Sequence, residues 1–291
     1  MVAGNVTVLP QPWFILVAMS SPPLFDEKLL LPQWPVPAQV RAVFTTRQGG
    51  VSVPPYDSLN LGNHVGDDAQ AVAHNRDVLR RTVGLEPNYL EQVHSTRVQA
   101  LSGALDRVVC ADGSATSVPG VVCTVMVADC LPVLLADRQG RWVAALHAGW
   151  RGLLGEGGVG VVEQGVAQFL ESFKPLAPVD TAQGASELIA WLGPCIGPTV
   201  FEVGAEVREE FVAVDAGAEA CFSPLPQGKW LAELPALARR RLAACGITQV
   251  YGNDGSLPWC TVSNPARYFS HRRDRISGRM AACIWIDGGV V

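Results

Sequence analysis

The stretch ADCLPVLLADRQGRWVAALHAGWRG, residues 128–152, holds two apolar runs separated by the polar turn DRQGR. Each run has the length of one strand and is apolar throughout, which is typical of strands buried on both faces. Cys130 begins the first run and His147 ends the second. The pattern therefore puts a thiol and an imidazole, both good ligands for zinc, at matching ends of two adjacent strands.

The composition is that of a globular protein. Of the 291 residues, 48% are apolar and 17% are charged, which is a balance that supports a sizeable core. The net charge of -5 gives no basic field to attract nucleic acid or anionic lipid, so we expect neither as a partner. The apolar segment WFILVAM, residues 13–19, is too short to span a bilayer, and we expect no membrane association.

The cysteines indicate a reducing compartment. The chain has eight cysteines and no CxxC pair, and several of them lie inside apolar runs. Free thiols in the cytoplasm are the better interpretation at this chain length, with most of them acting as small core residues. We expect the seven cysteines other than Cys130 to be dispensable for chemistry.

The apolar pattern predicts strands and helices in an irregular order. Gly and Pro turns and helix caps set the expected limits. The expected strands cover residues 40–50, 89–101, 120–129, 130–137, 141–147, 186–193 and 278–286. The expected helices cover residues 67–84, a single segment from Gly152 to Phe173, 204–214 and 229–246.

This order lacks the regular alternation of strand and helix that a doubly wound fold needs. We therefore predict an α+β fold, a single layered domain with a mixed sheet and packed helices. Residues 1–39 are predicted as an irregular Pro-rich segment and residues 40–291 as one catalytic domain.

Three residues form a candidate metal site. His94 lies in the expected strand QVHST, on one face with Gln92 and Thr96, and Cys130 and His147 lie at other strand ends. Two imidazoles and one thiolate suit a zinc ion with a fourth position open for water. Spacing alone leaves the alternatives open, since each could be a solvated or core side chain without any ligand.

Other polar or glycine-rich stretches have weaker functional interpretations. Gly155, Gly157 and Gly160 match GxGxxG, but they do not follow a strand directly, so we interpret them as a helix entry. The basic run HRRDRISGR, residues 271–279, and Arg47 are candidates for phosphate binding, with a solvated loop as the alternative for the run.

Nine motifs in order resemble those of the laccase-domain family. They are TTRQGGVS, LNLGNHVGDD, NRDVL, QVHS, DGSAT, ADCLPVLLAD, HAGWRG, LGPCIGP with VFEVG, and YFSHRRD with SGRMAACIW. This family was named for multicopper polyphenol oxidases and was later described as purine nucleoside phosphorylases with adenosine deaminase side activity. The resemblance extends from about Val40 to Ile286.

The resemblance implies a site and an activity. His94, Cys130 and His147 are implied as zinc ligands and catalytic residues, and Arg47 is a candidate for substrate binding. The implied reaction is zinc-dependent phosphorolysis of adenosine, inosine, guanosine or methylthioadenosine, with adenosine deamination beside it. The family fold is related to toxin deamidases that use a catalytic Cys–His pair. The alternative is therefore a zinc-free cysteine hydrolase or deamidase that uses Cys130 and a histidine.

Copper laccase chemistry is not expected. A laccase needs about ten histidines, many of them in HxH pairs, to hold its copper centres. This chain has five histidines and no HxH pair. One copper ion could occupy a His–Cys–His site, but we do not expect it as the native metal.

Our first prediction concerns the translation start. The segment from Met19 already has the length and pattern of a family N-terminus, and residues 1–18 contain no charged side chain. We expect translation to begin at Met19 and residues 1–18 to be dispensable for folding, zinc binding and catalysis. Intact-mass measurement of the natively expressed protein checks the start. A chain beginning at Met19 that fails to fold or to bind zinc would contradict the second part.

Overall fold

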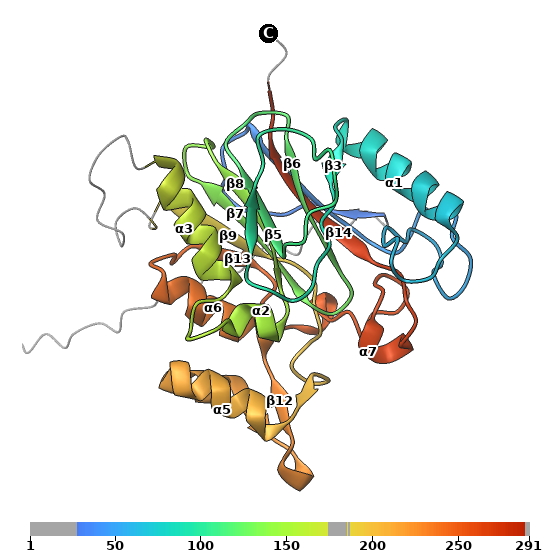
Figure 1. The fold of residues 1–291 in the computed structure, drawn as a ribbon. Coiled ribbons are helices and arrows are strands. Elements are labelled where there is room, and N and C mark those ends of the chain that lie inside the picture. The colour runs from blue at the N-terminus through green and yellow to red at the C-terminus, as the bar shows by residue number, and fades with distance from the viewer. Residues whose placement is uncertain (1–27, 174–184, 186, 289–291) are drawn as a thin grey trace, which may run out of the picture.

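Residues 28–173, 185 and 187–288 are described by the computed structural model, and they are arranged in four layers (Figure 1). Two large sheets pack face to face in the middle, and helices cover the outer face of each. The prediction of a layered α+β fold is confirmed, with two large mixed sheets where the sequence predicted one.

The six-stranded sheet carries the stretch quoted above. Its strands have the order β13-β9-β7-β8-β5-β4. The central strands pair antiparallel, whereas the edge strands β13 and β4 run parallel to their neighbours. The strands are β13 (Val250–Gly252), β9 (Leu188–Leu192), β7 (Leu131–Asp137), β8 (Val143–Ala148), β5 (Gly113–Thr116) and β4 (Val98–Ala100).

The five-stranded sheet has the order β1-β2-β14-β6-β3. The last strand of the chain, β14, lies in its centre and pairs antiparallel with both neighbours. The strands are β1 (Leu29–Leu30), β2 (Val40–Thr45), β14 (Met280–Ile286), β6 (Val122–Val127) and β3 (Pro87–Asn88).

Strand β7 shows why the central runs are apolar at every position. Its alternate residues Val133 and Leu135 belong to the core beneath the helices, whereas Leu134 and Ala136 belong to the core between the two sheets. Successive side chains of a strand point to opposite faces, so a strand in the middle of four layers must be apolar on both.

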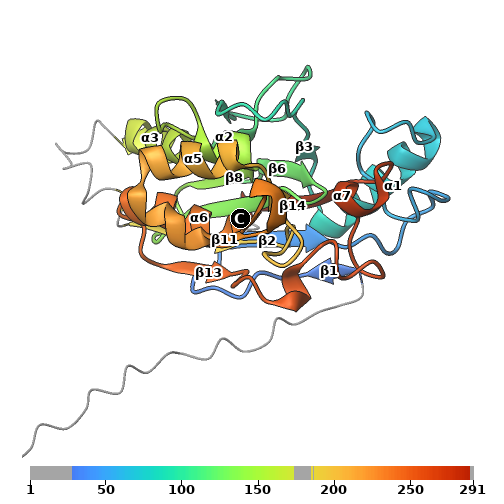
Figure 2. The same cartoon turned by 90° about the horizontal axis from the view of Figure 1, so that it is seen from below.

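Helices cover the two outer faces unequally. Most of them pack on the six-stranded sheet, and α1 packs on the five-stranded sheet, on the opposite side of the molecule (Figure 2). A small sheet, β10-β12-β11, joins the larger group. The helices are α1 (Ala69–Val83), α2 (Trp150–Leu154), α3 (Val161–Phe173), α5 (Ala205–Val214), α6 (Leu234–Ala244) and α7 (His271–Asp274). The remaining elements are β10 (Glu202–Val203), β11 (Phe222–Pro224), β12 (Trp230–Ala232) and the 3-10 turns Ala216–Cys221, Pro226–Gly228 and Leu257–Trp259.

Helix α1 forms where its capping residues predict it. The Asp68 carboxylate accepts a hydrogen bond from the Ala71 amide at 2.8 Å, and Gly84 ends the helix with a φ of 77°. These are the usual N-cap and C-cap devices of a helix. Among the described residues, neither α1 nor any other helix has the length and apolar character that crossing a bilayer requires.

The strand predicted over residues 89–101 is wrong in most of its length. Only Val98–Ala100 forms a strand, and His94 lies in a loop with a φ of 61°. The shared face expected for Gln92, His94 and Thr96 therefore does not exist. The alternation of residue types was right for a strand, but the backbone of this segment bonds to Asp112 instead of to a neighbouring strand.

Two helix predictions also need correction. The single helix expected from Gly152 to Phe173 is two helices, α2 and α3, because a glycine-rich loop separates them. Gly155 has a φ of 68°, and a Cβ there would lie 2.0 Å from the Val159 carbonyl oxygen, so the helix cannot continue. The helix expected over 229–246 begins only at Leu234, because Trp230–Ala232 pairs in the small sheet.

The boundary at residue 40 stays a prediction. Residues 1–27, including the segment before Met19, lie outside the described residues. Within the described part, Leu29 and Leu30 pair antiparallel with Thr45 and Phe44. The likeness to toxin deamidases also remains a prediction.

Candidate metal centre

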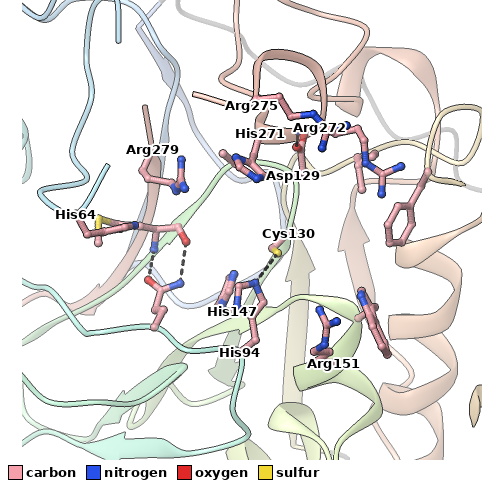
Figure 3. A pocket seen from close by; sticks show the side chains of 16 residues that line it. His64, His94, Asp129, Cys130, His147, Arg151, His271, Arg272, Arg275 and Arg279 are labelled. Carbon is pink, nitrogen blue, oxygen red and sulfur yellow. Dashed lines mark hydrogen bonds between the residues drawn. The ribbon is translucent and has the colours of Figure 1, made fainter. Parts of the chain in front are cut away.

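His94, Cys130 and His147 meet at one point. Their three ligand atoms lie within 4.8 Å of one another, and Cys130 Sγ is 3.6 Å from His94 Nε2 (Figure 3). The two imidazole rings are 4.9 Å apart at their centroids and inclined by 63°. His94 is exposed, Cys130 is half-buried and His147 is buried. The structure thus brings together the three residues that the sequence singled out.

The pairing of β7 with β8 positions two of the three. The strands are antiparallel, and Pro132 lies opposite His147 in the register. Cys130, which directly precedes β7, is therefore next to the end of β8, where His147 stands. This register is the physical reason that a cysteine and a histidine at matching ends of two runs become neighbours.

His94 reaches the same point from a loop that Asp112 holds. The Asp112 side chain is fully buried and accepts hydrogen bonds from the backbone amides of His94 at 2.9 Å and Ser95 at 2.6 Å. It also accepts from the Ser95 hydroxyl at 2.7 Å and lies 2.8 Å from His147 Nδ1. One carboxylate thus sets the backbone of one candidate ligand and the ring of another. The sequence patterns did not single out Asp112, although it begins the quoted motif DGSAT.

The backbone of Gly149 lies very close to two of the candidate ligands, Cys130 and His94. A Cβ at this position would lie 2.9 Å from both Cys130 Sγ and His94 Cδ2. A side chain at this position would therefore displace two of the three candidate ligands. The glycine in HAGWRG is explained by this contact.

The donor set fits zinc. Ligand atoms around a tetrahedral zinc ion are about 3.5 Å apart, close to the Cys130–His94 separation in the structure. Asp112 engages Nδ1 of His147 and leaves Nε2 for the metal, an arrangement in which a carboxylate fixes the tautomer and the ring orientation. The three residues leave a fourth tetrahedral position for a water or a substrate oxygen.

Without a metal, the site favours a negatively charged Cys130 thiolate beside a positively charged His147 imidazolium. Burial disfavours the thiolate, but the nearby imidazoles, His147 first, outweigh it and lower the pKa of Cys130 to about 6. Burial likewise disfavours the imidazolium, but Cys130 and Asp112 raise the pKa of His147 to about 9. For Asp112, burial is outweighed by the bonds from His147 and Ser95, which lower its pKa to about 2. Metal binding at neutral pH must therefore displace a proton from His147.

The candidate ligands open into a pocket of about 360 Å³. Basic side chains dominate its wall, and several of them come from the predicted phosphate-binding run 271–279 (Figure 3). The wall also includes Trp150, Phe201 and Met126 as apolar surface. The basic side chains are Arg151, Arg272, Arg275, Arg279, His64 and His271.

Two arginines that the sequence singled out point elsewhere. Arg47 does not line this pocket; its guanidinium donates to the carbonyls of Asp57 at 2.7 Å and Pro265 at 3.0 Å. Arg273 donates to the carbonyl of Thr261 at 2.8 Å. Arg47 as a substrate-binding residue remains a prediction, and its contacts are those of a residue that joins loops.

Asp129, directly before Cys130, also lines the pocket, and its contacts indicate a structural role. One carboxylate oxygen accepts from the Thr261 hydroxyl at 2.6 Å, and the other accepts from the Arg272 amide at 2.6 Å. Both oxygens are thus engaged, and Asp129 joins the turn before Cys130 to α7. Arg151 and His64, by contrast, line the pocket without having been singled out, because isolated basic residues in a loop or a helix start have no distinctive pattern.

The chain matches the family described as multi-copper polyphenol oxidoreductase laccase over residues 41–287. The chain belongs to this family. The resemblance found in the nine motifs is therefore confirmed. The family name refers to copper. It does not identify the metal of this chain, for which the evidence is the set of candidate ligands, His94, Cys130 and His147.

Relatives and solved structures agree over most of the chain. The Escherichia coli protein named purine nucleoside phosphorylase YfiH is 48% identical over 262 residues, covering 89% of this chain and 99% of its own. The Pseudomonas aeruginosa purine nucleoside phosphorylase PA4543 is 47% identical, covering 89% and 98%. The crystal structure of Neisseria meningitidis NMB0706 has a TM-score of 0.76 at 43% identity, covering 90% of this chain and 100% of that one.

We predict that Asp112→Asn weakens metal binding. The asparagine side chain has one acceptor oxygen, which cannot accept from the three backbone amides of residues 93–95 and from His147 at once, so both histidines lose their orientation. Zinc affinity should fall about 10–100-fold, as for other carboxylates that support a metal-bound histidine. A competition titration against a chromophoric chelator measures this.

Asp137→Asn is the matched control for that variant. Asp137 is equally buried and pairs with Arg141 at 2.7 Å at the other end of β7. This variant should lose stability and keep its zinc affinity. Equal zinc affinity for wild type and Asp112→Asn would show that the carboxylate does not position the ligands.

We also predict an unusually reactive thiol in the metal-free protein. The rate of Cys130 alkylation by iodoacetamide should rise with pH around a midpoint of about 6, instead of the usual value of about 8.5. Below this midpoint the thiolate is protonated and the rate falls. Subtracting the profile of Cys130→Ser removes the contribution of the exposed Cys110. A difference profile centred near 8.5 would contradict the charge separation.

Proposed function

We propose that this protein is a zinc-dependent purine nucleoside phosphorylase. The observation that carries the proposal is the His94–Cys130–His147 cluster at the base of a pocket walled by arginines. The names of the relatives support it, because proteins at 47–49% identity that align over 98–99% of their own length are named purine nucleoside phosphorylases. The substrates would be a purine nucleoside and inorganic phosphate.

The reaction joins phosphate to C1′ of the ribose while the bond from C1′ to the purine nitrogen breaks. The purine leaves with a proton, and the attacking phosphate gives one up. A bound zinc ion would supply an electrophile that polarises an oxygen ligand. Metal identity rests on the donor set, because two imidazoles and a thiolate favour zinc over harder ions.

The chain's own residues would hold the phosphate. Arg279 lies just before β14 and beside His64, and Arg272 and Arg275 come from the α7 region (Figure 3). Guanidinium groups bind phosphate oxygens in pairs of parallel hydrogen bonds. Burial, Arg279 and Arg76 all lower the pKa of His64, which favours its neutral form.

Adenosine deamination is a companion activity that we propose from the family resemblance. Zinc deaminases of nucleosides and bases often add a glutamate in an HxE pair. This chain contains no HxE, so a deaminase reaction would need a different proton carrier, for which His64 and His271 in the pocket are available.

A cysteine enzyme without metal is the second candidate. The observation that favours it is the Cys130–His147–Asp112 arrangement, in which the Cys130 pKa is lowered to about 6 and Asp112 orients His147. A thiolate paired with an oriented imidazole is the usual nucleophile of cysteine hydrolases. Substrates would then be amides or esters.

The cellular setting is inferred from the cysteines. All eight are free thiols in the structure, as in proteins of a reducing cytoplasm, where we propose that the enzyme works. The three candidate ligands all come from one chain, so the proposed metal site does not need a second subunit.

We predict that Cys130→Ser loses zinc and phosphorolysis together. The protein as purified should hold close to one zinc ion per chain. A panel of adenosine, inosine, guanosine and methylthioadenosine, with and without phosphate, should show a free base only with phosphate, by mass spectrometry. In Cys130→Ser, turnover should fall by at least about a hundredfold, since one of three metal ligands is missing.

Cys110→Ser is the matched control, because Cys110 is exposed and does not line the pocket. It should keep zinc and turnover. Full turnover by Cys130→Ser would reject both candidates. Turnover that survives removal of metal by a chelator while still requiring Cys130 would favour the cysteine enzyme.

A further inference from the structure

The pocket has more positive charge than one phosphate requires. Its lining includes four arginines and, among the described residues, a single carboxylate, that of Asp129. Both oxygens of Asp129 already accept hydrogen bonds, from the Thr261 hydroxyl and from a backbone amide. Within the described ranges, no lining arginine forms an ion pair with an acidic side chain. The four are Arg151, Arg272, Arg275 and Arg279.

These arginines lie on two sides of the candidate metal ligands. Arg272, Arg275 and Arg279 lie on one side of Cys130, together with His64 and His271, and Arg151 lies on the other (Figure 3). The two sides come from different elements, α2 and the region from α7 to β14, so the cavity has two places where an anionic group would meet a guanidinium.

Arg151 is oriented by a ring and not by an acidic side chain. It belongs to α2, which begins directly after the strand that ends with His147 and Ala148. Its guanidinium stacks on the indole of Trp150, with the carbon Cζ 4.3 Å from the ring centroid. Stacking orients the planar group and leaves the N–H groups at its edge able to donate to an anion.

A neutral nucleoside would not use this position. In the proposed reaction the inorganic phosphate occupies the side of Arg279, and C1′ of the ribose faces it. C5′ is attached to C4′ on the same face of the ribose as the purine, whereas the phosphate attacks C1′ from the opposite face. The 5′ carbon therefore points away from that phosphate, toward the side of Arg151. An anionic group on C5′ would meet the edge of the guanidinium there.

We propose that Arg151 and Trp150 form a second anion subsite and that the enzyme accepts purine nucleoside 5′-monophosphates. This inference rests on the proposed phosphorolysis. The balanced step converts the nucleotide and inorganic phosphate into a free purine and ribose 1,5-bisphosphate. The bond from C1′ to the purine nitrogen breaks, a bond from C1′ to a phosphate oxygen forms, and the proton lost by phosphate balances the one gained by the purine.

The test compares adenosine with adenosine 5′-monophosphate on the zinc-loaded full chain, with phosphate present. Mass spectrometry detects adenine and ribose 1,5-bisphosphate. The bisphosphate forms only if the 5′-phosphate is still attached when the base leaves, so its detection excludes a route through adenosine. We expect wild type to produce both compounds from the nucleotide.

The variant Arg151→Gln isolates the subsite. The ratio of kcat/KM for the nucleotide to that for adenosine should fall at least about tenfold, mainly through KM, because one charge-assisted hydrogen bond to the 5′-phosphate is lost. Arg41→Gln is the control, because Arg41 is exposed and does not line this pocket. Its ratio should stay at the wild-type value.

The outcomes distinguish the two proposals. Turnover of adenosine without turnover of the nucleotide would overturn the second subsite alone. Turnover of the nucleotide with an unchanged ratio in Arg151→Gln would overturn the assignment to Arg151. Turnover of neither compound by zinc-loaded wild type would overturn the proposed phosphorylase activity itself.

Discussion

The bond between Asp112 and His147 is the interaction on which the site depends. A carboxylate buried between strands is stable only if donors surround it, and Asp112 receives hydrogen bonds from three backbone amides, a hydroxyl and an imidazole. Satisfying this charge fixes the loop of His94 and the ring of His147 simultaneously. The two imidazoles are therefore positioned by the same requirement, and a metal ion would find them already arranged.

Backbone strain is concentrated at the same place. His94 and Asp129 have φ values of 61° and 86°, in the left-handed region that residues with a Cβ rarely adopt. Each is held there by bonds that a relaxed backbone would lose: the His94 amide to Asp112, and the Asp129 carboxylate to Thr261 and to the start of α7. Strain of this kind persists only where neighbouring contacts over-determine it. Here it places His94 and Cys130 next to each other.

The parts of the structure that depend on local pattern could be predicted from the sequence. The runs that form β6, β7, β8 and β14 are buried at every position, which is a direct consequence of lying in the middle of four layers. Cys130 and His147 could be predicted as neighbours because the first residue of one strand in an antiparallel hairpin lies beside the last residue of the other. The loop of His94 could not be predicted as a loop, because the group that bends it, Asp112, is 18 residues away and acts only in the folded protein.

The arginines that line the pocket also could not be predicted from local sequence. The run 271–279 is visibly basic, but only folding decides that Arg272, Arg275 and Arg279 line the pocket whereas Arg273 does not. Arg151 has no basic neighbour in sequence and joins them because α2 starts where β8 ends. A chain with a net charge of -5 thus concentrates positive charge in one cavity. Such a local field favours anionic ligands at this position over the rest of the surface, which is the arrangement that a phosphate-using enzyme needs.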